Sequence, residues 1–222
     1  MMNFLQPTVL IDWILVEPEK DEDGPVVLPV PLLPVIEIVK PEEGTTGDDT
    51  LTGDNNPDQI LGNAGNDDID GKGGDDSLLG GSGGDTIDGG NGNDMIIGGD
   101  GYDVLRGGSG DDWIEGGSKT DVIFTGAGAD VIHFDADPAE ADRSGLGTDL
   151  VFGFDLGVDR VSFGDALLDE SVADQFVVEP GFGIGATLYA FTAFGELEDI
   201  AWFVDLEVAE LQAAVDDGSL FV

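Results

Sequence analysis

A nine-residue repeat runs without interruption from Gly44 to His133 and constrains the fold more than any other feature of the chain. In this frame the ten units read GTTGDDTLT, GDNNPDQIL, GNAGNDDID, GKGGDDSLL, GGSGGDTID, GGNGNDMII, GGDGYDVLR, GGSGDDWIE, GGSKTDVIF and TGAGADVIH. Every unit has Asp at its sixth position and Leu or Ile at its eighth. A fixed period of this kind indicates a solenoid, in which each unit buries its apolar residue only by stacking on its neighbours.

The glycines, the aspartate and the aliphatic residue of each unit have distinct expected roles. Glycine adopts positive φ at low cost, so the G-G-x-G part predicts a tight turn with its backbone carbonyls accessible. The aspartate two residues later adds an anionic oxygen where these carbonyls converge. Ligand sets made only of oxygen suit Ca²⁺ far better than zinc or copper. The last three residues of each unit predict a short strand whose single aliphatic side chain points inward.

Two units make one coil, so the repeats predict an all-β, right-handed parallel β-roll of ten nonapeptides with up to about eight Ca²⁺ ions between its coils. The expected carboxylate ligands are Asp49, Asp58, Asp67, Asp76, Asp85, Asp94, Asp103, Asp112, Asp121 and Asp130. The expected carbonyl ligands lie near Gly65, Gly74, Gly81, Gly83, Gly90, Gly92, Gly99, Gly101, Gly108 and Gly110. Two later half motifs of the form G-x-D-x-U add Asp149 and Asp159 as further candidates.

The units are not equivalent. Residues 80–115 hold four complete units, so we expect the tightest sites there. In the second unit Asn56 and Pro57 disturb the turn. In the ninth, Lys119 occupies a glycine position and brings a positive charge next to a cation site, which should weaken that site.

The charge of the repeat block makes a cation necessary for folding. It holds eighteen Asp and one Glu against two Lys and one Arg, a net charge of −16. Stacked turns oppose these like charges, and the single aliphatic residue of each unit provides little apolar burial. We therefore expect the block to be largely disordered without calcium and folded with it.

The flanking segments divide the chain into three parts: 1–43, 44–133 and 134–222. The first contains apolar residues interleaved with Pro29, Pro31 and Pro34, which excludes a transmembrane helix and predicts an extended arm or cap. The third contains degenerate repeats over 144–163, strands near 176–178, 186–194 and 200–206, and a helix over 208–215. We expect it to form a mostly β cap with a core built on Phe152, Phe154, Phe163, Phe176, Phe191 and Trp202.

Composition argues against several classes of function. The net charge of −41 repels nucleic acid and anionic membranes, and the chain has no cysteine for a disulfide. Its only histidine, His133, excludes histidine-rich zinc sites and would have to serve any Ser-His-Asp hydrolase. Residues 80–84 match G-x-S-x-G, but the nonapeptide frame already requires those glycines. We therefore expect a protein that is not an enzyme.

These repeats resemble those of the RTX (hemolysin-type calcium-binding repeat) family. The resemblance implies secretion from a Gram-negative bacterium through a type I exporter, with folding delayed until the chain meets extracellular calcium. In that family an uncleaved, acidic C-terminal signal ends in a short apolar run. Here no Lys or Arg follows Arg160, and the chain ends Asp216-Asp217-Gly218-Ser219-Leu220-Phe221-Val222.

Three hypotheses about function follow from these observations. The first is a secreted calcium-binding β-roll that serves as an extracellular binding or structural module. The second is a Ca²⁺-bridged adhesion or matrix module that binds acidic polysaccharide or a cell surface, for which Tyr102, Arg106 and Trp113 are the candidate contacts. The third is a small hydrolase or lyase in the C-terminal half. The sequence does not identify the biological target.

Overall fold

The computed structural model describes residues 41–134, 148–163, 176–180, 185–191 and 197–222. Residues 1–40 of the predicted N-terminal arm therefore lie outside the described residues, and its last residues, Glu42–Glu43, form β1, which pairs with β3. Two sheets make up the described fold, and one short helix accompanies them. No helix in the described part of the chain is long and apolar enough to cross a membrane.

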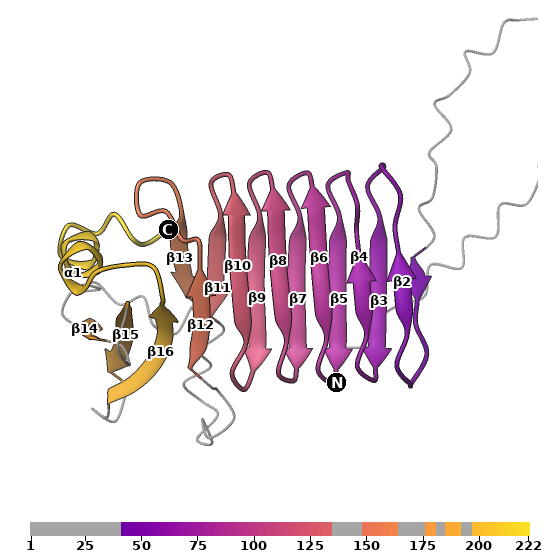
Figure 1. The fold of residues 1–222 in the computed structure, drawn as a ribbon, viewed down its shortest axis with the longest axis horizontal. Coiled ribbons are helices and arrows are strands. Elements are labelled where there is room, and N and C mark those ends of the chain that lie inside the picture. The colour runs from indigo at the N-terminus through magenta and orange to yellow at the C-terminus, as the bar shows by residue number, and fades with distance from the viewer. Residues whose placement is uncertain (1–40, 135–147, 164–175, 181–184, 192–196) are drawn as a thin grey trace, which may run out of the picture. The chain divides into compact units, whose positions relative to one another are not determined.

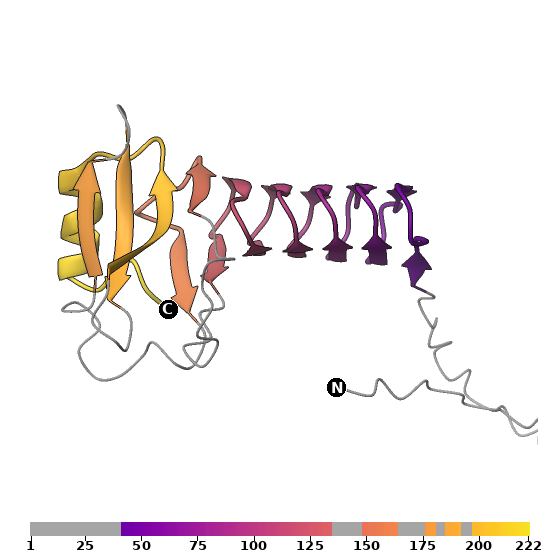
Figure 2. The same ribbon diagram turned by 90° about the horizontal axis from the view of Figure 1, so that it is seen from below.

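Successive strands of the repeat block alternate between two parallel sheets, as expected for a β-roll (Figure 1). Sheet A has the order β1-β3-β5-β7-β9-β11-β13, and sheet B runs β14-β15-β16-β12-β10-β8-β6-β4-β2. The strands of the repeat block are β1 (Glu42–Glu43), β2 (Thr50–Thr52), β3 (Gln59–Ala64), β4 (Asp68–Asp70), β5 (Ser77–Ser82), β6 (Thr86–Asn91), β7 (Met95–Asp100), β8 (Val104–Ser109), β9 (Trp113–Ser118), β10 (Val122–Ala127) and β11 (Val131–Phe134). Figure 2 shows the chain passing back and forth between the two layers.

The strands are longer than the three residues that the sequence predicted. From β5 to β10 each strand has six residues and continues through the first three positions of the next unit, of which the first two are glycines except at Thr125 in β10. The tight turn is therefore confined to the fourth, fifth and sixth positions. The prediction was wrong because a glycine backbone can also join a parallel ladder, and these glycines pair in register: Gly81 pairs with Gly99, and Gly99 with Gly117.

The eighth-position residues form a continuous apolar ladder between the sheets. From Ile60 to Ile132 these side chains are at most 1% exposed, and only Leu51 in the first coil is more open, at 7%. Each is in register with the equivalent residue one coil away, as in the pairing of Ile96 with Ile114. The sequence prediction of one inward aliphatic residue per unit is confirmed.

The degenerate repeats continue both sheets beyond His133. Strand β12 (Asp149–Phe152) pairs with β10, and β13 (Arg160–Phe163) pairs with β11. Val151 and Val161 take the place of the aliphatic ladder residues and are buried. The roll therefore gains a further coil in which the nine-residue spacing is lost but the pairing register is kept.

The C-terminal residues extend sheet B with antiparallel strands and add one helix. Strands β14 (Phe176–Pro180), β15 (Ala186–Phe191) and β16 (Leu197–Phe203) pair in order, β16 joins β12, and α1 (Val208–Asp216) contacts β14 and β15. These elements lie close to their predicted ranges.

The predicted aromatic core of this region was only partly right. Phe154 and Phe163 are buried, whereas Phe152 stacks on Phe124 in sheet B and Trp202 is only half-buried. Phe203, next to Trp202, is fully buried and packs edge-on against Phe154, with 4.9 Å between the ring centroids. The side chains of Phe176 and Phe191 lie outside the described set.

Candidate metal sites

The sixth-position aspartates form two parallel ladders, one along each edge of the roll. In each ladder the backbone N–H of one aspartate donates to Oδ1 of the equivalent aspartate in the next coil. The first ladder joins Asp49, Asp67, Asp85, Asp103, Asp121 and Asp149, with N···Oδ1 distances of 2.7–2.9 Å. The second joins Asp58, Asp76, Asp94, Asp112, Asp130 and Asp159, at 2.8–3.0 Å.

Asp149 and Asp159 each take the last place in one of these ladders. Asp121 donates to Asp149 at 2.9 Å, and Asp130 donates to Asp159 at 3.0 Å. Their separation in sequence from the preceding aspartate is larger than the regular spacing of eighteen. The structure thus aligns the two half motifs with the regular repeats, although a stretch of chain outside the period separates them.

The second carboxylate oxygen of the central aspartates is buried without a hydrogen-bond partner. This holds for Oδ2 of Asp67, Asp76, Asp85, Asp94, Asp103, Asp112, Asp121 and Asp130. The eight side chains are at most 3% exposed. A buried carboxylate oxygen without a donor is costly, so a row of them on each edge indicates that a cation or protons are needed.

All of these oxygens except that of Asp130 lie close to the first-position glycine of their own unit. A Cβ added to Gly98, for example, would lie 2.6 Å from Oδ2 of Asp103 and 2.5 Å from the carbonyl oxygen of Gly116 one coil later. The first-position glycines from Gly62 to Gly107 all show this arrangement, with both oxygens within 2.7 Å of the added atom. A carboxylate oxygen and a backbone carbonyl therefore converge on a space that only glycine leaves open.

The first-position carbonyls are not among the ligands predicted from the sequence. The predicted carbonyls lie near the second- and fourth-position glycines and stay a prediction, and nearly all of these glycines have a left-handed backbone. Gly81, Gly83, Gly90, Gly92, Gly99, Gly108 and Gly110, with Gly65 and Gly74, have φ between +101° and +139°. Gly101, the remaining member of that set, lies directly over the carbonyl of Gly83. The repeat carries a signal for the first position, because nine of ten units begin with Gly.

The ends of the ladders differ from the middle. Oδ2 of Asp49 accepts a hydrogen bond from Thr45 N–H at 2.6 Å, and Oδ2 of Asp58 accepts one from Asp54 N–H at 2.7 Å. At the other end, the nearest atoms of the described residues to an added Cβ on Gly116 belong to Asp121, out to 3.2 Å. Among the described residues, an unpartnered Oδ2 and a converging carbonyl occur together at Asp67, Asp76, Asp85, Asp94, Asp103 and Asp112, which we term the complete sites.

The last unit has a side chain where the others have a glycine. Thr125 occupies its first position, is fully buried, and its Oγ1 has no hydrogen-bond partner. Oδ2 of Asp130 in the same unit is also unpartnered. Thr125 is not among the residues predicted from the sequence, although it is the one first position of the ten units that is not Gly.

Burial raises the pKa of nine ladder aspartates: Asp76, Asp85, Asp94, Asp103, Asp112, Asp121, Asp130, Asp149 and Asp159. Desolvation is the largest cause for each of these nine, and neighbouring carboxylates add to it, while the hydrogen bond from the preceding coil opposes it. The pKa rises to about 6 for Asp76, Asp103 and Asp130, to about 7 for Asp112 and Asp121, and to about 8 for Asp149. Without a counter-ion, the folded roll therefore keeps these aspartates in buried surroundings that disfavour their charged form.

The donor set fits calcium. The converging atoms are carboxylate and carbonyl oxygens, which a hard cation of flexible geometry prefers, and the described residues contain no group of three or more His, Cys, Asp or Glu side chains. The carboxylates are instead distributed singly along the two edges. Any cation here must therefore take much of its coordination from the backbone of two adjacent coils.

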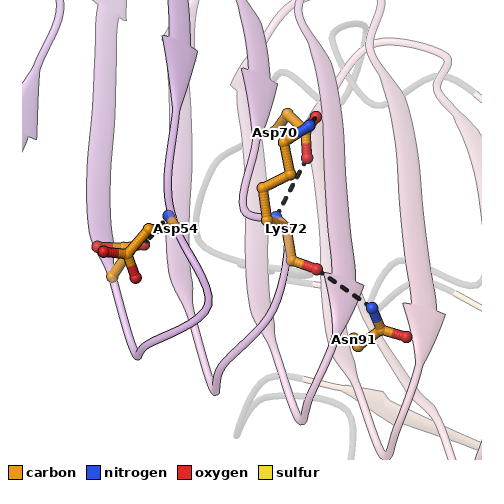
Figure 3. Close-up of polar contacts among 5 residues, drawn as sticks. Asp54, Asp70, Lys72 and Asn91 are labelled. Carbon is orange, nitrogen blue, oxygen red and sulfur yellow. Dashed lines mark hydrogen bonds and ion pairs between the residues drawn. The ribbon is translucent and has the colours of Figure 1, made fainter.

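Two lysines lie among the turns at positions that glycine usually occupies. Lys72, at the second position, has φ 74° and forms an ion pair with Asp70, while its carbonyl accepts from Asn91 Nδ2 at 3.4 Å (Figure 3). Lys119, at the fourth position, has φ 75° and places its Nζ over the ring of Tyr102, 5.0 Å from the ring centroid. Its charge lowers the pKa of Asp103 and Asp121 against the dominant effect of burial.

The residues considered for other functions are dispersed. Tyr102 is 67% exposed on a turn, Arg106 lies over Phe124 on sheet B, and Trp113 stacks on His133 on sheet A. They do not form one common surface of the kind that polysaccharide binding would need. The His133 ring nitrogen Nδ1 lies 3.1 Å from Ser162 Oγ, a pair that the regular register of β11 and β13 brings together.

Comparison with known proteins identifies the repeats. The family model described as the RTX calcium-binding nonapeptide repeat (4 copies) matches residues 43–78, 70–105 and 106–137. This segment of the chain therefore consists of RTX calcium-binding repeats, as the sequence predicted. No curated protein sequence matches the chain.

Several solved structures share partial similarity with the chain. Two are subunits of a mannuronan C5-epimerase from Azotobacter vinelandii. AlgE6R3 is 23% identical over 75% of either chain (TM-score 0.34), and AlgE6R2 is 21% identical over 83% of this chain and 93% of its own (TM-score 0.38). The extracellular lipase LipA from Serratia marcescens is 16% identical, with 77% of this chain covering 38% of the lipase (TM-score 0.32). TM-scores this low do not support an argument about the fold. The fold is therefore assigned from the strand register of this chain alone.

Proposed function

We propose that this protein is a secreted, non-catalytic module whose roll folds when Ca²⁺ fills the spaces between adjacent coils. The observation that carries the proposal is the set of eight buried, unpartnered Oδ2 atoms on the two edges. Each complete site would hold Ca²⁺ through Oδ2 of its aspartate and the first-position carbonyl one coil later. We expect the six complete sites to fill first, and those of Asp121 and Asp130 to be weaker.

Bound calcium would supply positive charge where the fold places negative charge. The repeat block has a net charge of −16, so about eight Ca²⁺ ions would neutralise it. The chain itself provides the geometry of the sites: the hydrogen bonds to Oδ1 orient each carboxylate, and the aliphatic ladder keeps the coils in register. Asp149 and Asp159 would hold the last coil to the roll in the same way.

The direct test is a calcium titration of the whole chain that is monitored by circular dichroism and small-angle scattering. With a chelator the chain should be expanded, and millimolar Ca²⁺ should compact it cooperatively and raise its β content. Mg²⁺ should substitute poorly because its small octahedral shell fits a backbone turn badly. A roll that stays folded in excess chelator would contradict the proposal, since the aliphatic ladder would then be sufficient.

We further propose export by a type I system, with folding after export. The apolar end of the expected signal is part of the fold: Leu220 is fully buried, and its carbonyl accepts from Val161 N–H at 2.7 Å. An exporter could therefore read this segment only while the chain is unfolded, a condition that the low calcium of the cytosol provides. Removal of the last third of 134–222 should retain the protein inside a host with a matching exporter, whereas removal of 1–43 should not. The reverse result would contradict the proposed route.

Hydrolysis is the one catalytic function for which the structure offers an observation, the contact of Ser162 with His133. Both residues are half-buried on the outer surface of a parallel sheet, and Trp113 covers one side of the imidazole. We propose that this pair is structural. Ester hydrolysis by the calcium-loaded protein that disappears in Ser162→Ala would overturn this assignment.

A further inference from the structure

The outward seventh and ninth positions of sheet A carry few charges for so acidic a chain. From β3 to β13 these positions hold Gln59, Leu61, Ser77, Leu79, Met95, Ile97, Trp113, Glu115, Val131, His133, Arg160 and Ser162. One of these residues is acidic and one is basic. The equivalent positions of sheet B carry Asp68, Asp70, Asp88 and Arg106, and from β8 to β12 the others are Val104, Val122, Phe124, Leu150 and Phe152. In a chain of net charge −41, two opposite charges among these twelve positions make sheet A a local exception.

Five apolar side chains are contiguous on this surface and define what we term the sheet A patch: Leu61, Leu79, Met95, Ile97 and Trp113. Strand register places Leu61 next to Leu79, Leu79 next to Ile97, and Met95 next to Trp113. Met95 is 44% exposed, and the other four are partly exposed. The second-position glycines Gly81, Gly99 and Gly117 border the patch and leave the surface beside it flat. Contiguous exposed apolar surface of this kind marks an interaction site.

The geometry and charge of the patch favour a second copy of the chain as its partner. Its side-chain rows repeat at the spacing of neighbouring strands, about 4.8 Å, and an identical sheet offers the same spacing, so the rows can interdigitate. A cationic partner would be drawn to the acidic turns and to sheet B instead. Two copies that meet through sheet A bring together the sheet surface with fewer charges and keep the acidic edges apart.

The available area is sufficient for a weak, specific dimer. From β3 to β13, four six-residue strands of about 20 Å and two four-residue strands of about 13 Å, at about 4.8 Å spacing, give about 500 Å² per copy, or about 1,000 Å² in total. That value lies at the lower end of specific protein interfaces. A two-fold interface also buries the same patch on both copies and leaves no half of it exposed.

We propose that the sheet A patch is the interface of a calcium-dependent homodimer, in which two rolls pack sheet A against sheet A. The proposal rests on the proposed calcium-driven folding, because the patch exists only when the coils stack. Dimerisation should strengthen as salt is raised, since screening weakens the repulsion between two strongly acidic copies and leaves the apolar contact intact. An association driven by charge would show the opposite dependence.

The test is sedimentation velocity on the full chain, with and without Ca²⁺, for wild type and two matched variants. Leu79→Asp places a charge in the centre of the patch at a ninth position, where Asp70 and Asp88 already occur in sheet B. Thr86→Asp places the same charge on sheet B at a seventh position, beside Asp68. Both substitutions copy an arrangement that the roll already contains, so both variants should fold.

We expect calcium-loaded wild type and Thr86→Asp to sediment as dimers at micromolar to submillimolar concentration, and Leu79→Asp as a monomer. Circular dichroism of each sample separates folding from association. If wild type gains β structure with Ca²⁺ but remains monomeric at high salt, or if both variants dimerise alike, the interface is wrong and calcium-driven folding stands. If wild type gains no structure with Ca²⁺, the proposed function fails as well. Should Leu79→Asp not fold, Ile97→Asp repeats the test one strand away on the same row.

Discussion

Each ladder aspartate uses its two carboxylate oxygens for different purposes. Oδ1 accepts the backbone N–H of the preceding coil, which fixes the orientation of the carboxylate, and Oδ2 remains without a donor. At the start of the second ladder this division is lost, because Oδ2 of Asp58 accepts the N–H of Asp54. The same residue type thus has a different role in the first coil and in the middle of the roll.

Substitution of Asp94 and Asp58 by alanine should separate these roles. Asp94→Ala removes an unpartnered Oδ2 and the acceptor of Asp76 N–H. Calcium affinity and cooperativity should both fall, and the calcium concentration at which half of the chain is folded should rise by about threefold to tenfold. Asp58→Ala removes an oxygen whose hydrogen bond is local and should have a clearly smaller effect. Calcium titrations monitored by circular dichroism measure the calcium midpoint of each variant. Equal shifts would mean that the unpartnered oxygen does not mark the stronger site.

Gly98 tests whether the first-position glycine is needed for space. Gly98→Ala introduces a methyl group that would overlap the carbonyl oxygen of Gly116 and Oδ2 of Asp103, at 2.5 and 2.6 Å. Both contacts are with atoms that we assign to a calcium site, so folding should require at least about tenfold more Ca²⁺. Gly47→Ala is the control, since a Cβ there meets nothing within 4 Å. A Gly98→Ala roll that folds at the wild-type calcium concentration would show that the converging oxygens are not ligands.

The residue pattern predicted the positions of the ladder aspartates but not the atoms around them. The period of nine is visible in the sequence, and it places Asp49 to Asp130 at one phase. The convergence of Asp103 Oδ2 with the Gly116 carbonyl depends on how one coil lies over the next, which no local pattern encodes. Thr125 could have been noted as a departure from Gly, but its unpartnered hydroxyl is visible only once the chain is folded.

At the scale of elements, the two aspartate ladders predict a pH response of the metal-free chain. Their pKa values rise to about 6 for Asp76 and about 7 for Asp112 and Asp121, above about 3.9 for an unfolded Asp. The folded roll therefore binds more protons than the unfolded chain between about pH 4 and 7, and its stability falls as pH rises through that window. Metal-free protein should show more β structure by circular dichroism near pH 5.5 than near pH 7.5. A metal-free chain that gains structure as pH rises would contradict the assignment of these buried carboxylates.

Strand lengths show where element-scale prediction from sequence succeeds. The aliphatic position correctly located each strand, although in β5 to β10 it is the second of six residues. The helix over 208–215 was predicted because its apolar residues follow a helical period. The extension of β5 to β10 through two glycines was missed, since glycine is usually a turn former and the pairing of Gly81 with Gly99 is a tertiary effect. Trp202 was chosen over Phe203 for the core because both lie in one strand and only the register decides which one faces inward.

At the scale of the whole molecule, the end of the chain closes the last coil of the roll. Phe221 forms a parallel bridge with Val161 of β13, and Val222 N–H donates to the Val161 carbonyl at 3.2 Å. Leu220 is fully buried, and the Phe221 ring packs near Phe163 at 6.1 Å. These residues cover the edge of sheet A that β13 would otherwise expose. The expected export signal is therefore also a structural element, a dual role that the acidic, apolar tail did not reveal in the sequence.

Removal of residues 220–222 should therefore weaken folding without removing a single calcium ligand. Loss of the buried Leu220 side chain and of the two backbone hydrogen bonds to Val161 costs about 4 kcal/mol. If folding is coupled to about six ions, this cost spread over six sites raises the calcium midpoint by about threefold, while the number of bound ions stays the same. Titration calorimetry gives both quantities, and Val222→Ser is the control because that side chain is 62% exposed. An unchanged calcium midpoint would show that residues 220–222 do not stabilise the roll. A loss of bound ions would instead show that these residues are part of the metal sites.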